Sequence, residues 1–223
     1  MIKIKFKTQV LCIMTICFML AGCSSGKNLT NAYSRLVLQP GGEEGIDAFI
    51  EAWPYENYSN TNWSSYKGFA AAAWTAGGIQ TTARSLLKFD LKSIPAQKRI
   101  RRATLSLYSV SLPYIGEGHS SLSGPNDFII NRVISEWDEK KVTWNTQPRV
   151  TREGEIILPP SGSPDQDYTN IDVTELVQFM INNPSKNYGI MIRLLNESYY
   201  RSVVFGSSDY PNPEKRPKLV IEF

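Results

Sequence analysis

From about residue 33 the chain alternates short β-type runs with clusters of turn residues, and this pattern limits its fold more than any other feature. Residues 104–108 alternate polar and apolar side chains, as a half-buried strand does. Gly- and Pro-rich turns at 40–42, 77–78 and 159–162 separate such runs. Many short strands joined by turns favour a sandwich or barrel over an α/β fold. The predicted strands are 35–38, 48–50, 69–73, 85–89, 103–110, 128–133, 155–158, 189–195, 202–205 and 218–223.

One helix is predicted, over residues 173–183. Asp172 is placed to cap its first turn, with Glu175 three residues later. Pro184 ends it because proline cannot continue the helical hydrogen bonds. We expect this short helix to cover one end or edge of the sheets. Its apolar face consists of Val173, Leu176, Val177 and Met180.

The N-terminal segment has the features of a lipoprotein signal peptide, predicted over residues 1–22. Three lysines at positions 3, 5 and 7 precede an apolar run at 10–20, which is too short for a comfortable membrane span. The run ends in Leu-Ala-Gly-Cys, which resembles a bacterial lipobox, so Cys23 is the predicted lipidation site. Residues 23–34 then form a lipidated tether, and 35–223 a single domain. An N-terminal helix or an ordinary signal peptide is the alternative.

Cysteine placement and charge exclude several function classes. All three cysteines lie within the first 23 residues, so the predicted domain has neither a disulfide nor a thiol for a cysteine protease or a Cys-ligated zinc site. Without the three lysines of the signal segment, 21 basic residues face 21 acidic ones. A near-neutral domain disfavours a nucleic-acid partner.

Eight segments, in this order along the chain, agree with one known family: residues 84–95, 100–108, 132–139, 142–148, 171–177, 187–190, 205–208 and 216–219. Together they resemble the DNRLRE domain, also called carbohydrate-binding module family 96. The resemblance implies a jelly-roll-like β-sandwich, which makes the predicted fold all-β with one short covering α-helix. It also implies polysaccharide binding, with alginate as the ligand associated with the family.

The segment 53–74 is the strongest candidate for a binding site. It holds seven aromatic residues in 22 positions, where the chain average of 11% gives between two and three. Aromatic rings stack on the flat C–H faces of sugars, while neighbouring amides and hydroxyls bond their rims. The alternative is that the rings pack this segment onto the sandwich. The predicted carbohydrate-binding rings are Trp53, Tyr55, Tyr58, Trp63 and Tyr66.

An anionic glycan needs cations beside the rings. Lys67 and Arg84 flank the aromatic segment, and Arg193 belongs to a late predicted strand. Arginine suits carboxylates because its planar fork binds both oxygens. The alternatives are surface charges without a ligand and, for Arg84, a buried ion pair.

No cofactor and no metal ligands are predicted, although the acidic pairs 43–44 and 165–167 leave a structural calcium ion open. The single histidine, His119, lies in a Gly- and Ser-rich stretch, and no nucleophile elbow, phosphate loop or two-His metal motif occurs. We therefore expect a non-catalytic protein, with a polysaccharide lyase or hydrolase as the less favoured alternative.

These inferences combine into one prediction. The chain is expected to be a polysaccharide-binding lipoprotein of the bacterial cell envelope, anchored through Cys23 to the outer membrane or the cell surface. Its expected partners are an anionic polysaccharide such as alginate, the membrane, and other envelope proteins. A structural or adhesive envelope protein without sugar affinity is the main alternative, because a fold alone does not determine function.

Overall fold

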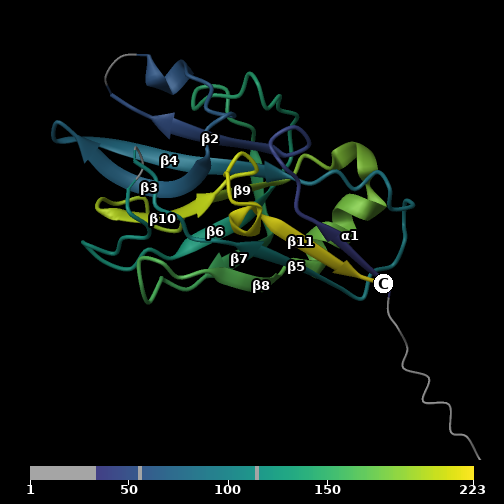
Figure 1. Cartoon of the computed structure of the whole chain (residues 1–223). Helices are drawn as coiled ribbons and strands as arrows, with labels where there is room; N and C mark the ends of the chain where they lie inside the picture. The colour runs from purple at the N-terminus through teal and green to yellow at the C-terminus, as the bar shows by residue number, and fades with distance from the viewer. Residues whose placement is uncertain (1–33, 55–56, 114–115) are drawn as a thin grey trace, which may run out of the picture. The chain divides into compact units, whose positions relative to one another are not determined.

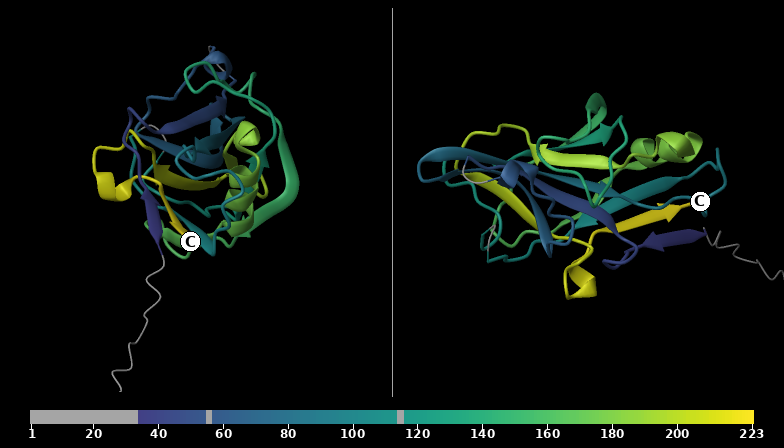
Figure 2. Two further views of the ribbon diagram at one scale, coloured as in Figure 1. Left: turned by 90° about the vertical axis from the view of Figure 1, so that its right-hand side faces the viewer. Right: turned by 90° about the horizontal axis from the view of Figure 1, so that it is seen from above.

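Two antiparallel β-sheets stack as two layers in the computed structural model, which describes residues 34–54, 57–113 and 116–223 (Figures 1 and 2). All described elements belong to one compact unit, residues 33–223. The predicted β-sandwich is confirmed. Within the described part of the chain, no helix has the length and apolar character needed to cross a membrane.

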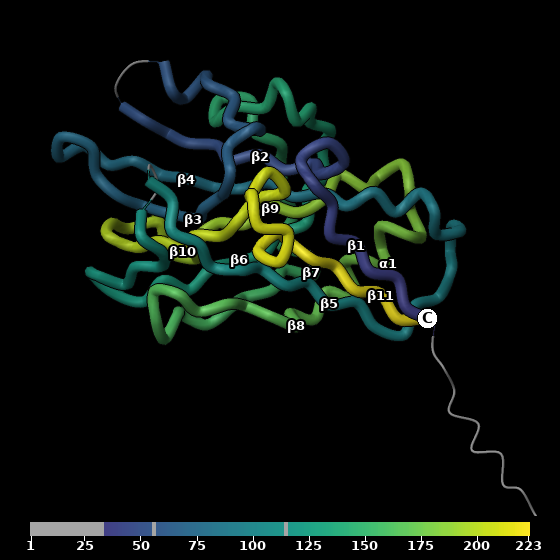
Figure 3. The backbone as a smooth tube through the Cα atoms, in the orientation of Figure 1, coloured from purple at the N-terminus to yellow at the C-terminus, as the bar shows by residue number. Residues whose placement is uncertain are grey.

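The smaller sheet has four strands and brings the two ends of the described chain together. Its first and last strands in sequence run antiparallel side by side, with Arg35 opposite Glu222 (Figure 3). The order across the sheet is β1 (Arg35–Leu38), β11 (Lys218–Glu222), β5 (Arg102–Leu107) and β8 (Tyr168–Asp172).

The larger sheet has seven strands, and its longest strand, β4, pairs with three others. The β3–β4 turn consists of Gly77 and Gly78, both with positive φ angles (54° and 84°), which glycine adopts without steric cost. The main path runs β10 (Arg201–Gly206), β3 (Gly68–Ala76), β4 (Ile79–Lys88), β9 (Ile190–Leu194), β6 (Phe128–Val133) and β7 (Val150–Leu158), and β2 (Ile46–Ala52) pairs with β4 beside this path.

The seven-stranded sheet carries apolar side chains on both faces. On one face Leu87, Phe128 and Phe205 join the main core, together with Leu105 and Ile221 of the other sheet. Because side chains alternate along a strand, the other face, which we call the outer face, presents a different set. There a smaller core is covered by the segment 134–149, and it contains Ala48, Ile50, Leu86, Val133, Val142 and Met191, with Trp137 and Trp144 packed against them.

The helix α1 (Thr174–Asn182) lies across one end of the sandwich (Figure 2, left). Its buried residues Leu176, Val177 and Met180 join the main core. The Asp172 carboxylate accepts a hydrogen bond from the Thr174 amide at 2.9 Å. The N-cap residue, however, is Val173, which makes no side-chain capping hydrogen bond, so the cap predicted at Asp172 is not the one observed. The predicted helix is confirmed to within one residue at each end. Three short 3-10 helices are η1 (Tyr58–Asn60), η2 (Pro184–Lys186) and η3 (Pro213–Lys215).

Each predicted strand overlaps an observed one, but β8 was not predicted. Its burial does not alternate: Tyr168 and Ile171 are buried, and the two residues between them are exposed. Asn170 has a positive φ of 58°, and the pairing with β5 shifts register at this point. A strand that is irregular in this way leaves no period-two pattern in the sequence.

Candidate functional site

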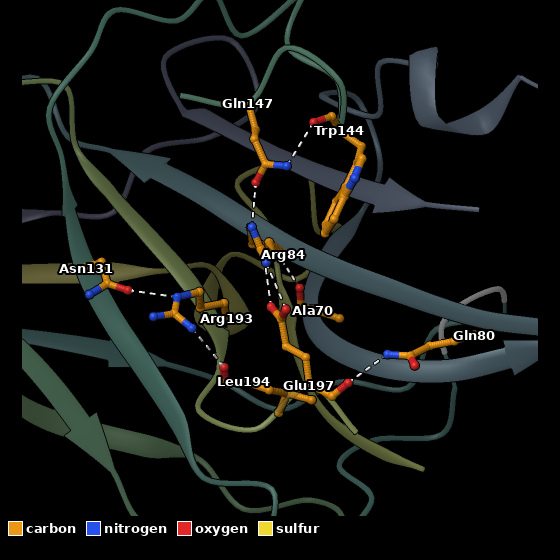
Figure 4. A network of polar contacts seen from close by, with 10 residues as sticks. Ala70, Gln80, Arg84, Asn131, Trp144, Gln147, Arg193, Leu194 and Glu197 are labelled. Carbon is orange, nitrogen blue, oxygen red and sulfur yellow. Dashed lines mark hydrogen bonds and ion pairs between the residues drawn. The ribbon is translucent and has the colours of Figure 1, made fainter. Parts of the chain in front are cut away.

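A cluster of polar side chains lies on the outer face of the seven-stranded sheet, with Arg84 of β4 at its centre (Figure 4). The guanidinium donates to both carboxylate oxygens of Glu197, from Nε at 2.7 Å and from Nη2 at 2.8 Å. Its Nη1 donates to Gln147 Oε1 at 2.8 Å, and its central carbon lies 4.7 Å from the centre of the Trp144 ring. The alternative of a paired Arg84 is therefore the one observed, and its charge is already balanced within the protein.

Arg193, from the neighbouring strand β9, lies in the same region (Figure 4). Its Nε donates to Asn131 Oδ1 at 3.0 Å, and Asn131 Nδ2 in turn donates to Glu155 at 3.3 Å. The hydrogen bond from Arg152 lowers the pKa of Glu155, and the charge of Arg193 acts in the same direction. The structure thus places both predicted arginines within one face, each held by partners from other strands or loops.

The predicted binding rings of the segment 53–66 form a continuous row. Successive ring centres are 5.7 Å apart from Trp53 to Tyr58, 5.7 Å from Tyr58 to Trp63, and 6.4 Å from Trp63 to Tyr66. All four rings are half-buried, and Trp63 and Tyr66 pack against the main core. The row is neither a fully exposed platform nor part of the interior. Tyr55 and Cys23 lie outside the described residues.

Asparagine side chains fix this aromatic segment to the segment 134–149. Asn62 Nδ2 donates to the carbonyls of Glu139 at 2.7 Å and Val142 at 2.8 Å. Asn145 Nδ2 donates to Asn60 Oδ1 at 2.8 Å. Asn145 directly follows Trp144, so the row of rings and the Arg84 cluster are joined through one loop. Lys67 is exposed and is not among the side chains that Arg84 contacts.

The sequence-based site omitted a group of exposed rings at the end of β3. The indole of Trp74 is 38% exposed and meets Tyr200 edge to face, with ring centres 4.9 Å apart. Tyr199 is 47% exposed, and its ring centre lies 5.3 Å from that of Tyr200. We call Trp74, Tyr199 and Tyr200 the exposed ring group. Trp74 belongs to the predicted aromatic segment, but the two tyrosines carry no sequence signal beyond their adjacency in a loop.

The exposed ring group and the Arg84 cluster share the loop between β9 and β10. Glu197, which holds Arg84, precedes Tyr199 by two residues, and its carbonyl accepts from Gln80 Nε2 at 2.8 Å. The hydroxyl of Tyr200 accepts from Thr75 Oγ1 at 3.2 Å. Rings and amides from β3, β4 and this loop therefore lie near one another, which is the combination that sugar recognition needs.

A group of acidic side chains lies beside β2, apart from the rings. Burial raises the pKa of Asp47, which is 2% exposed, to about 7, and the nearby charges of Asp209 and Glu139 add to the increase. Burial and the charge of Asp209 also raise the pKa of Glu139. Asp47 Oδ2 accepts from the Ser208 amide at 2.9 Å, and the Asp47 amide donates to Glu139 at 3.0 Å.

The acidic residues considered for calcium do not belong to this group, and those at 165–167 have partners within the protein. Asp165 accepts from Ser163 at 2.6 Å, and Asp167 pairs with Lys215 at 3.1 Å. Glu43 and Glu44 are exposed in the turn before β2. Among the residues that the structure describes, no three His, Cys, Asp or Glu side chains are placed to hold a metal ion together.

Comparison with known families decides the class of protein to which these features belong. The family profile of carbohydrate-binding module family 96 matches residues 43–223, the whole described region from the turn before β2 to the C-terminus. This chain belongs to carbohydrate-binding module family 96. No curated protein matches it. The family 96 module accounts for nearly all the described elements, β1 excepted, and family membership indicates a carbohydrate-binding domain.

Proposed function

We propose that this family 96 protein binds an anionic polysaccharide such as alginate without cleaving it. Family membership supports carbohydrate binding in general. The observation that carries the proposal further is the exposed ring group beside the Arg84 cluster. Trp74 and Tyr199 keep 38% and 47% of their surface in solvent, although apolar rings of this size are normally covered in a folded domain.

The arrangement of the rings suits a sugar chain. Trp74 and Tyr200 meet edge to face, so each supports the other in a fixed orientation before a ligand arrives. Rings held in this way lose little conformational entropy when a pyranose stacks on them. Amide and hydroxyl groups of Gln80 and Ser198 lie on the same strands and loop, where they can bond the rim of a stacked sugar.

The preference for negative charge rests on the arginines near the rings. Arg193 is half-buried and Arg201 begins β10 directly after Tyr200. Arg201 Nη2 donates to the Ser123 carbonyl at 3.0 Å, and the hydroxyl of Ser123 in turn contacts the backbone of Tyr199 and Tyr200. A guanidinium held in place recognises a carboxylate with better geometry than a lysine does. Uronate polymers carry one carboxylate on each sugar unit.

We also propose that the protein is a lipoprotein of the cell envelope, held at the membrane by acyl chains on Cys23. The apolar run at 10–20 and the Leu-Ala-Gly-Cys sequence support this. Labelling of cells with a radioactive or clickable fatty acid should mark the protein, and Cys23→Ser should remove the label and release the protein from the membrane fraction. A wild-type protein that carries no label would overturn this anchoring.

Affinity electrophoresis tests the binding proposal. The full-length protein should migrate more slowly in gels that contain alginate than in gels that contain a neutral glucan. Trp74→Ala and Tyr199→Ala should each restore much of the mobility and should lower the melting temperature less than removal of a half-buried ring does, because 38% and 47% of these side chains are exposed. Val37→Ala, which truncates a side chain 47% exposed on the other sheet, is the matched control. Retardation that persists in both ring variants would move the site elsewhere.

The same protein samples separate the alternatives. New reducing ends or unsaturated products after incubation with alginate would show a hydrolase or lyase. No retardation on any polysaccharide would leave the structural or adhesive envelope protein, which uses the same scaffold without sugar affinity.

A further inference from the structure

A hollow lies away from the ring group, at the end of the sandwich where β6 and β7 meet α1. Its volume is about 510 Å³, within the range typical of ligand pockets. Arg132 of β6, Glu153 and Thr151 of β7, Phe179 of α1, and Lys186 and Tyr188 contribute to its lining. We call it the Arg132 hollow.

Arg132 is held in this hollow in a fixed orientation. The residue is only 8% exposed, and its guanidinium carbon lies 3.8 Å from the centre of the Phe179 ring. Such a cation–π contact keeps the guanidinium plane in place and covers one of its faces. The nitrogen edge remains for an acceptor that lies in the plane. A buried guanidinium of this kind favours a carboxylate partner, because an unpaired buried charge is unfavourable.

In the structure this carboxylate partner is Glu153, and its ion pair with Arg132 is weak. Arg132 Nη2 donates to Glu153 Oε2 at 2.8 Å, yet the Glu153 side chain is 82% exposed. An ion pair with one partner so open to water contributes little free energy. Within the described residues Glu153 has no second cation, and the Lys186 ammonium, which also lines the hollow, has no carboxylate partner. A ligand carboxylate that meets both cations therefore competes well with Glu153.

We propose that the Arg132 hollow binds the carboxylate of a uronate unit, and that Glu153 occupies the guanidinium until the ligand displaces it. The inference rests on the proposed function, since it names a second contact for the same anionic polysaccharide. Arg132 receives the carboxylate, Lys186 adds the second positive charge, and the half-buried Tyr188 provides a wall for the sugar ring. Glu153 acts as a competitor built into the chain.

Two exposed substitutions test this without disturbing the core. In calorimetric titrations of the full-length protein with alginate oligosaccharides at low salt, Glu153→Gln should tighten binding roughly two- to five-fold, because it removes the competing carboxylate. Lys186→Gln should weaken binding roughly two- to five-fold by the same reasoning. Glu214→Gln and Lys92→Gln make the same charge changes at exposed positions outside the hollow and should have smaller effects.

Alginate oligosaccharides whose carboxyl groups have been reduced to alcohols provide a second set of titrations. With these neutral ligands Glu153→Gln and Lys186→Gln should bind as the unmodified protein does, since the ligand then has no carboxylate that competes with Glu153 for Arg132 or meets Lys186. If the protein binds alginate but both variants match their charge controls, the Arg132 hollow is not a uronate site and the proposed function stands. If the unmodified protein binds no anionic polysaccharide at all, the proposed function fails, and the hollow fails with it.

Discussion

Arg84 and Glu197 form a two-pronged ion pair between β4 and the loop before β10, with N–O distances of 2.7 and 2.8 Å. Both side chains are about one-quarter exposed. The pair joins β4 to the loop that carries Tyr199 and Tyr200. Trp144 and Gln147 complete the surroundings of the guanidinium.

Glu197→Gln should therefore lower the melting temperature by several degrees and weaken polysaccharide retention. The substitution removes the charge partner of a half-buried guanidinium, which costs about 2 kcal/mol after allowing for partial exposure. Thermal unfolding followed by circular dichroism measures the first effect, and affinity electrophoresis the second. Asp90→Asn, which breaks an exposed 3.8 Å pair with Lys92, is the control and should leave both values unchanged. Full stability in Glu197→Gln would contradict this role.

The half-buried row of rings leads to a different expectation from the exposed ring group. Trp63→Ala should lower the free energy of unfolding by about 2 to 4 kcal/mol, because the indole packs on the main core and touches the rings of Tyr58 and Tyr66. Urea denaturation measures this loss. Trp74→Ala, the control with a more exposed indole, should lose less than half as much. Equal losses in the two variants would show that exposure does not distinguish these rings.

The fold was predictable because the strands obey local rules. Alternating side chains in segments such as 103–107 and the glycine pair at 77–78 are visible within a few consecutive residues of the sequence. The apolar face of the helix at 174–182 is likewise visible within ten residues. The strand β8 escaped because its burial is irregular. Strand ends also shifted: β4 begins at Ile79, six residues before the predicted start, because the buried positions of this added part are Thr81 and Ala83, which do not form a run of large apolar side chains.

The site was less predictable because it depends on contacts between distant residues. Arg84 and Glu197 are 113 positions apart, and no local pattern indicates that they meet. Trp63 and Trp74 belong to one aromatic segment, yet one packs on the core and the other faces solvent. Composition identified the segment correctly as unusual, but exposure is decided by tertiary packing. The predicted contacts of Trp53, Tyr58, Trp63, Tyr66, Lys67, Arg84 and Arg193 with a glycan remain predictions.

Asp47 predicts a stability that falls as pH rises. Burial raises its pKa from 3.8 to about 7 in the folded protein, so its protonated form is favoured there. The stabilising contribution is complete below pH 3.8 and is lost as pH rises through about 7. Between pH 5 and pH 8 this group should lower the free energy of unfolding by about 2 to 3 kcal/mol.

The Asp47→Asn variant isolates this effect, because the amide oxygen can still accept from the Ser208 amide while the charge is gone. Urea denaturation at pH 5 and pH 8 should show a smaller decrease for the variant than for the unmodified protein. Asp165→Asn, at an exposed carboxylate, should keep the original decrease. A variant with the same pH dependence as the unmodified protein would place the titrating group elsewhere.

His119 joins its loop to the edge of β10, and its removal should destabilise the fold. Nδ1 accepts from the Val204 amide at 2.9 Å, so Nε2 donates to the Gln166 carbonyl at 2.8 Å, and the ring must be neutral. Burial lowers the pKa of His119 below 6.5, so its contribution to stability is present above pH 6.5 and is lost as pH falls through the folded-state pKa.

His119→Ala should lower the free energy of unfolding by about 2 to 4 kcal/mol in urea denaturation at pH 7, because it leaves two buried backbone groups unpaired. His119→Asn, which can still accept from Val204, should recover part of the loss, whereas Ser121→Ala, at an exposed neighbour, should change nothing. A His119→Ala protein as stable as the original would mean that water replaces both bonds and that the histidine has no structural role.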